Sequence, residues 1–157
     1  MNGSSHRAIG RSDHLSSETS HILNTTGEGL VLSDLHQQLR ERTKQFAIRV
    51  VKMVQRLPKT DEARTMGRQL LRSGTSVAAN YRAVGRARSK AEFIAKMGVV
   101  VEEADETVFW LELLIDTGIV RKDQTQELLG ESNELLAIFA ASHRTAKSRG
   151  GKFEEAA

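Results

Sequence analysis

The sequence contains no cysteine and only one proline, and both absences limit what the chain can be. Without Cys there is no disulfide framework, no thiolate metal ligand and no thiol nucleophile, which fits a reducing compartment. A single proline and 4% aromatic residues are typical of a helical protein rather than a strand-rich one. No apolar run approaches the roughly 20 residues that span a bilayer, and no secretory signal opens the chain. We therefore expect a cytoplasmic protein with no membrane partner.

Charge is distributed unevenly, although the net charge is only +3. Residues 40–96 hold 15 Lys or Arg and 4 Asp or Glu, a net of +11, whereas residues 97–134 hold 2 against 10, a net of −8. Such an asymmetry indicates either a polyanionic partner or neighbouring segments that neutralise each other.

The 157 residues suggest one folded domain with a tail at each end. Residues 1–33 are rich in Ser, Thr, Gly and His without a sustained period, so we interpret them as a disordered or non-native tail. Ser33 or Asp34 can cap a first helix. Residues 34–148 then carry helical periodicity, and residues 149–157 are expected to fray.

Four amphipathic helices are predicted within residues 34–148. Their apolar positions predict the core, which on the second helix consists of Met66, Leu70, Val77, Tyr81 and Val84. On the third helix the predicted core is Phe93, Ile94, Met97, Val100, Val101, Ala104, Val108, Leu111 and Ile115. The helices are separated by the turn and cap signals Leu57-Pro58, Thr60, the capping box Ser89–Glu92, and Gly118. Helices of this length with short loops predict an all-α, up-down antiparallel four-helix bundle.

A strip of arginines runs along the second predicted helix, opposite its apolar face. At 100° per residue five of them fall within about 80° of one another. The strip comprises Arg64, Arg68, Arg72, Arg82 and Arg86, and Arg88 follows it. A separate strip of small residues, Gly67, Gly74, Ala78 and Gly85, predicts a close helix approach. These glycines do not match a nucleotide-binding loop, which also needs a lysine and a preceding strand.

Three interpretations of the arginine strip are open. It is a solvated helix face, a site for nucleic-acid backbone, or a surface that meets an acidic face of another chain. Arginine rather than lysine favours the last two, because guanidinium groups make bidentate contacts with phosphates and carboxylates.

The third predicted helix carries a second mixed face outside its core stripe. A large aromatic residue beside aliphatic and acidic ones suggests a subunit interface, although Trp110 can also simply cover the edge of the bundle. The predicted homo-oligomer interface consists of Val99, Glu102, Glu106, Trp110 and Leu113.

Catalytic patterns are absent from the sequence. Glu102, Glu103, Asp105 and Glu106 lie off the predicted core stripe and lack the Glu-x-x-His pairs of di-metal bundles. His143 lies near the apolar face of the fourth predicted helix, where a buried, hydrogen-bonded histidine is the commoner explanation. We expect no enzyme activity, no cofactor and no metal site.

Four stretches resemble the four-helix bundle proteins of the 23S rRNA-intervening sequence type, and the likeness covers residues 34–148. They are LRERTKQFAIRVV (39–51), LPKTDEARTMGRQLLRSGTSVAANYRA (57–83), RARSKAEFIAKMGVVVEEADETVFWLELL (86–114) and LLGESNELLAIFAAS (128–142). The sequence departs from the family at Ala79, where glycine is common, and at Ala83, where an acid is common.

The resemblance implies a bacterial cytoplasmic bundle that assembles into a ring, typically a homopentamer. A related branch of the family serves diversity-generating retroelements by binding nucleic acid and a reverse transcriptase. The resemblance therefore implies RNA, DNA or a protein such as a reverse transcriptase as partners. Two hypotheses follow. The bundle binds nucleic-acid backbone through the arginines, or it is an assembly or adaptor scaffold whose arginines pair with Glu102, Glu103 and Glu106 of an adjacent subunit.

Overall fold

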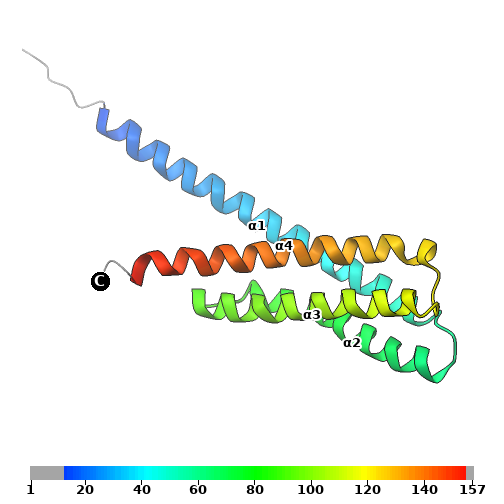
Figure 1. The fold of residues 1–157 in the computed structure, drawn as a ribbon. Coiled ribbons are helices and arrows are strands. Elements are labelled where there is room, and N and C mark those ends of the chain that lie inside the picture. The colour runs from blue at the N-terminus through cyan, green and yellow to red at the C-terminus, as the bar shows by residue number, and fades with distance from the viewer. Residues whose placement is uncertain (1–12, 155–157) are drawn as a thin grey trace, which may run out of the picture. The chain divides into compact units, whose positions relative to one another are not determined.

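The computed structural model describes the backbone of residues 13–154 and the side chains of residues 33–148. The described backbone holds four α-helices and no strand (Figure 1). They are α1 (Asp13–Val54), α2 (Asp61–Val84), α3 (Lys90–Asp116) and α4 (Lys122–Glu154). The chain divides into two compact units, residues 1–37 and 38–157. The second unit contains the last part of α1 and all of the other three helices.

Helix α1 begins at Asp13, so the predicted start at Ser33 or Asp34 is wrong. No proline occurs before Pro58, and a helix that has nucleated extends through residues that do not break it. The predicted tail of residues 1–33 stays a prediction, and its first twelve residues lie outside the described residues. Helix α1 ends at Val54, three residues before Leu57, and tight turns lead the chain into Pro58.

The predicted caps position α2 and α3. The Thr60 hydroxyl accepts a hydrogen bond from the Ala63 amide at 3.3 Å, and the Ser89 hydroxyl accepts one from the Glu92 amide at 3.1 Å. The Glu92 carboxylate accepts the backbone N–H of Arg88 at 2.8 Å rather than that of Ser89. This bond is the main cause of the lowered pKa of Glu92. Helix α3 stops before Gly118, whose φ of +70° lies in the left-handed region that favours glycine.

Buried residues follow a repeat of alternating steps of three and four on each helix. On α2 the buried line consists of Ala63, Gly67, Leu70, Gly74, Val77, Tyr81 and Val84. On α3 it runs through Met97, Val100, Ala104, Thr107, Leu111 and Leu114. An average step of 3.5 residues is the pattern of helices that pack with a small left-handed crossing angle. The predicted core position Ile115 is therefore replaced by Leu114, which is fully buried.

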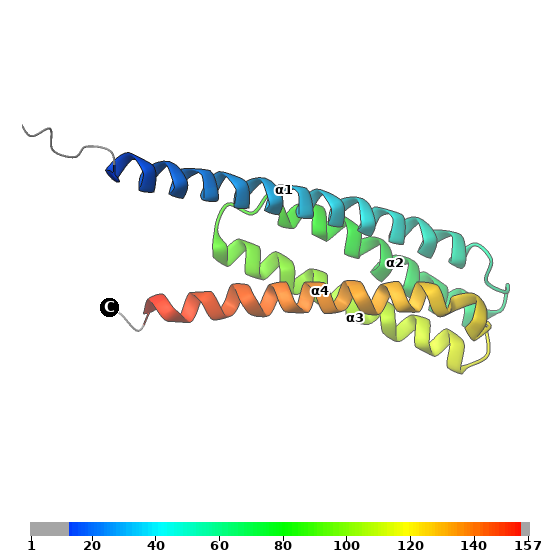
Figure 2. The same ribbon diagram turned by 90° about the horizontal axis from the view of Figure 1, so that it is seen from above.

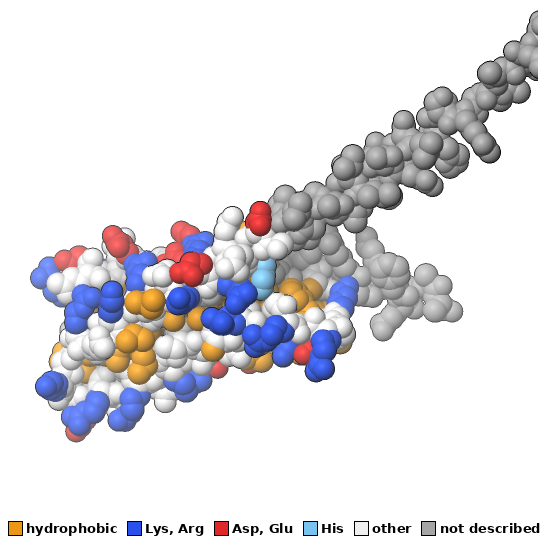
Figure 3. Space-filling view, turned by 180° about the vertical axis from the view of Figure 1, so that it is seen from behind, with side chains coloured by type: hydrophobic (Ala, Val, Ile, Leu, Met, Phe, Trp, Pro, Cys, Tyr) orange, Lys and Arg blue, Asp and Glu red, His pale blue; other side chains and the backbone are white. Residues whose placement is uncertain are grey.

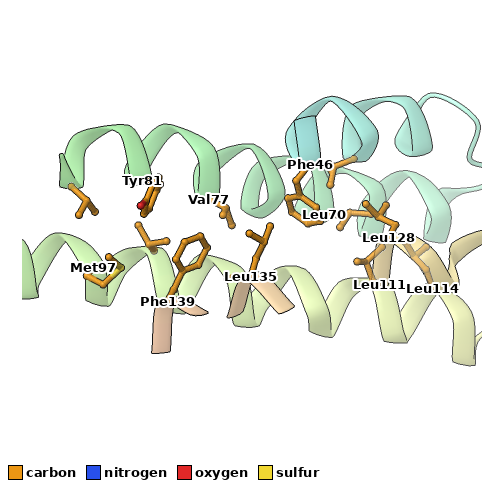
Figure 4. Close-up of a cluster of buried hydrophobic side chains, with 14 residues drawn as sticks. Phe46, Leu70, Val77, Tyr81, Met97, Leu111, Leu114, Leu128, Leu135 and Phe139 are labelled. Carbon is orange, nitrogen blue, oxygen red and sulfur yellow. The ribbon is translucent and has the colours of Figure 1, made fainter. Parts of the chain in front are cut away.

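The core is continuous along the inside of the bundle (Figure 4). Phe46 of α1, Leu70 of α2 and Leu111 of α3 lie toward one end. Toward the other end, the rings of Tyr81 and Phe139 pack at a centroid distance of 5.2 Å. Burial raises the pKa of Tyr81 to about 12. The prediction that Tyr81 faces the core is confirmed.

Two glycines of α2 allow α1 and the turn that follows it to approach closely. A Cβ atom at Gly74 would lie 2.9 Å from both Cγ atoms of Val50, and one at Gly67 would lie 2.7 Å from Cδ1 of Leu57. Gly67 and Gly74 thus belong to the same buried line as Leu70 and do not form a separate strip. Gly85 is exposed and follows the end of α2, so its predicted packing role is wrong.

Within the second unit the helices form an all-α bundle, as predicted. Helix α3 packs against both α2 and α4, and residues 38–54 of α1 contact α2 through Val50 and α4 through ion pairs. Figure 2 shows successive helices running in opposite directions. In the same view α1 and α2 lie on one side of this unit and α3 and α4 on the other.

Candidate nucleic-acid interface

Basic side chains gather on the side of the bundle that α1 and α2 form. Figure 3, which views this side, shows Lys and Arg spread along it, with acidic side chains mainly along one edge. The predicted site residues Arg64, Arg68, Arg72, Arg82, Arg86 and Arg88 are all exposed. Their positions on and just after α2 place them outside the buried line of that helix, as the sequence predicts.

Arg72 differs from the other arginines because it links α2 to α3. Its guanidinium forms ion pairs with Glu106 and, at 3.3 Å, with Glu103. The hydrogen bond to Glu106 is the main cause of the raised pKa of Arg72 and of the lowered pKa of Glu106. Glu103 and Glu106 therefore pair with an arginine of their own chain, whereas the second hypothesis assigned them to an adjacent subunit.

A second ion-pair cluster links α1 to α4. Arg42 donates two hydrogen bonds to Glu131, at 2.7 and 2.8 Å, and contacts Glu134 at 2.6 Å. The hydrogen bond from Arg42 is the main cause of the lowered pKa of Glu131. Arg49 lies 3.7 Å from Glu127 one turn earlier on α4. The basic and acidic segments thus neutralise each other in part, which was one of the two explanations for the charge asymmetry.

The remaining arginines on and just after α2 keep their charge toward solvent. Among the described side chains, no carboxylate forms an ion pair with Arg68, Arg82 or Arg86. Arg64 pairs with Asp61 at 3.1 Å within its own helix and donates to the Lys59 carbonyl at 3.4 Å, and Arg88 lies 3.7 Å from Glu92. Exposed pairs of this kind contribute little and exchange readily with other anions.

The arginine strip adjoins a groove between α1 and α2. This groove has a volume of about 450 Å³, and Arg64, Arg68 and Lys59 line it together with apolar side chains such as Leu57 and Leu71. Sequence periodicity placed the arginines on one face but gave no sign of the groove, because it depends on how α1 and α2 pack near their connecting turn.

The outward face of α3 carries the predicted interface residues and one that sequence reasoning missed. Val99 is 42% exposed and Phe109 is 51% exposed. Trp110 is half-buried, packs against the core, and donates its indole N–H to Glu106 at 3.1 Å. Leu113 is half-buried and Glu102 is exposed. Phe109, which packs edge-on against Trp110 at 4.9 Å, is the most exposed large hydrophobic residue among those described. Phe109 lies seven residues, or about two helical turns, after Glu102, so this spacing could have indicated that both share one face of α3.

Metal ligation and membrane insertion find no support among the described residues. Within this part of the chain no three His, Asp or Glu side chains come together as metal ligands would. Over the same residues no helix carries an apolar stretch long enough to cross a membrane.

Fold and charge together define a class of protein, the small helical bundle with one basic side. The profile of the 23S rRNA-intervening sequence protein family matches residues 36–141. The chain belongs to this family, which confirms the resemblance seen in the sequence.

A crystal structure agrees with this assignment. It is that of a protein of unknown function from the S23 ribosomal protein family of Bacteroides thetaiotaomicron. The two chains are 33% identical with a TM-score of 0.64, and the match covers 69% of this chain and 97% of the other. No curated protein matches this chain significantly.

Proposed function

We propose that this protein is a non-enzymatic helical bundle that binds RNA or DNA backbone through the side formed by α1 and α2. The observation that carries the proposal is the separation of the arginines into two sets. Arg42 and Arg72 are held by carboxylates of α4 and α3, whereas Arg68, Arg82 and Arg86 have no ion pair with any described carboxylate. The second set is available to an external anion.

The arrangement of this set fits a backbone contact rather than base recognition. Arg82 lies in the last turn of α2, Arg86 lies just after the helix ends at Val84, and Arg68 lies several turns earlier on the helix. Arginine side chains on one rigid helix can bind successive phosphates without reading base edges. Tyr81, the aromatic residue next to Arg82, is buried and does not offer a stacking surface. We therefore expect weak sequence preference.

The test is a titration of the purified chain with single-stranded RNA and duplex DNA at increasing salt. Each phosphate that a protein neutralises on duplex DNA lowers the logarithm of affinity by about 0.9 for each tenfold rise in salt. With three to five arginine contacts we expect affinity for duplex DNA to fall by roughly 2.7 to 4.5 orders of magnitude per tenfold rise in salt. Affinity that does not change with salt, or no binding at low salt, would contradict the proposal.

A second candidate function, an assembly scaffold, is favoured by the exposure of Phe109 and Val99 on α3. Both residues lie on α3, whereas the arginines without an ion pair to a described carboxylate lie on and just after α2, so the two candidate functions use different helices. The mass of the same sample, measured by light scattering, tests this candidate. A multiple of 17.4 kDa supports it, and a monomer at all concentrations contradicts it. The homopentameric ring implied by the resemblance belongs to this candidate.

A further inference from the structure

A second basic cleft lies at the end of the bundle where the chain turns from α1 to α2 and from α3 to α4. Its volume is about 450 Å³, and its walls come from residues 49–58 and 119–128. Sites for small molecules commonly have volumes of about 300–1,000 Å³. The cleft is therefore large enough to hold a ligand and is distinct from the groove beside Arg64.

The floor of this cleft is apolar. Met53 and Leu57 of the α1 end and Ile119 and Val120 of the α3–α4 turn line it, and all four also pack against the core. Gly118 makes this floor possible, because its φ of +70° reverses the chain just before Ile119. The Val120 amide then donates to the Leu114 carbonyl at 3.1 Å and fixes the turn. Such a floor can receive a flat ring.

The rim of the cleft carries four cations, Arg49, Lys52, Arg56 and Arg121, and one carboxylate, Glu127. Two of these cations form ion pairs, because Arg49 lies 3.7 Å from Glu127 and Arg121 lies 2.7 Å from Asp123. Lys52 and Arg56 are exposed, and neither forms an ion pair with a described carboxylate. The first turn of α4 forms another wall of the cleft through Gln124 and Thr125. The positive end of the helix dipole there adds to the positive potential of the cleft.

We propose that this cleft binds a phosphorylated nucleoside, with the phosphate on Lys52 and Arg56 and the base on the apolar floor. An apolar floor beside two uncompensated cations fits a ligand with a ring at one end and a dianion at the other. Arginine and lysine both bind phosphate, the first through paired N–H groups and the second as a point charge. This inference goes beyond the proposed function, because it concerns a second site with its own ligand.

The ligand can come from two sources, a free mononucleotide or the phosphorylated end of a strand. Leu57 and Pro58 line both this cleft and the groove beside Arg64 and Arg68. The cleft therefore adjoins the basic side of α2, and the phosphorylated end of a bound strand is within its reach. Both sources present the same chemistry to Lys52 and Arg56.

The experiment measures binding of adenosine monophosphate by calorimetry to the wild-type chain and to the Lys52→Glu/Arg56→Glu variant. Adenosine and inorganic phosphate serve as separate probes, and a short oligonucleotide is used with and without a 5′-phosphate. We expect the variant to bind adenosine monophosphate or the phosphorylated oligonucleotide at least tenfold more weakly. Adenosine and phosphate alone should each bind at least tenfold more weakly than adenosine monophosphate.

Two control variants make the outcome specific. Arg144→Glu/Lys147→Glu makes the same change of charge on exposed residues of α4, roughly 30 Å along that helix from its start, and should retain binding. Arg82→Glu/Arg86→Glu should lose nucleic acid but retain adenosine monophosphate, which separates this site from the proposed function.

If the Lys52→Glu/Arg56→Glu variant loses affinity for the phosphorylated oligonucleotide alone, the cleft binds strand ends. This result supports the proposal. The proposal is overturned if neither ligand depends on Lys52 and Arg56, or if the α4 control loses as much affinity. Circular dichroism of each variant checks that the exposed substitutions leave the bundle folded.

Discussion

Replacing Arg82 and Arg86 by glutamate is expected to reduce affinity for duplex DNA by on the order of 100-fold at 50 mM salt. The magnitude follows from counterion release. At this salt concentration each phosphate contact contributes slightly more than one order of magnitude to the binding constant, and the variant loses two contacts. The new carboxylates also repel the strand, so the loss should exceed this value rather than fall short of it.

The fold should survive this double substitution. Both side chains are exposed and form no ion pair with a described carboxylate, and exposed substitutions of this kind usually change stability by less than about 0.5 kcal/mol. Arg82 lies in the last turn of α2, where loss of a cation costs a further 0.3–1 kcal/mol, roughly. A thermal melt of the variant verifies that binding, and not folding, is affected.

The matched control is Arg144→Glu/Lys147→Glu, which makes the same change in net charge on α4. At 50 mM salt, charges more than about 15 Å from the bound strand are largely screened. We therefore expect less than a fivefold loss of affinity in this control. Equal losses in the two variants would show that net charge alone governs binding and would contradict the assignment of the site to α2.

The largest effect on stability is expected at Gly74, where leucine should lower the free energy of unfolding by about 3 kcal/mol or more. The first atom of the new side chain would lie 2.9 Å from both Cγ atoms of Val50. Val50 is fully buried, and a β-branched side chain in a helix has essentially one rotamer, so it cannot move aside. Helix α1 must then separate from α2, which exposes part of the core.

Gly130 provides the control for this substitution. It lies within α4, is exposed, and no atom lies within 4 Å of a Cβ placed there. Leucine at Gly130 should stabilise the protein by up to about 1 kcal/mol through helix propensity alone. Urea denaturation of both variants measures the difference. Similar stabilities for Gly74→Leu and Gly130→Leu would show that the close approach of α1 and α2 is wrong.

The fold was largely predictable because its signals are local. Thr60 and Ser89 cap their helices through side chains that act within three residues, and Gly118 ends α3 through its own backbone freedom. The buried line of α3 was less predictable at its end, where Leu114 rather than Ile115 is buried. Both are aliphatic, and only packing against the neighbouring helices at an average step of 3.5 residues decides between them.

For the candidate site, the sequence predicted only which face of α2 carries it. Periodicity placed the arginines of α2 on one face, but it could not distinguish Arg72, which pairs with Glu103 and Glu106, from Arg68, which does not. That difference depends on the register of α2 against α3. The cleft beside Lys52 and Arg56 was not predicted either, because segments far apart in the sequence form it.

Mapping where nucleic acid lies on the protein tests the proposed interface most directly. Single-stranded RNA is crosslinked to the chain by ultraviolet light at low salt, and the crosslinked peptides are identified by mass spectrometry. If nucleic acid binds the basic side, the crosslinks fall within residues 38–88, on α1, α2 and the turn between them. Crosslinks confined to α3 and α4 would contradict it.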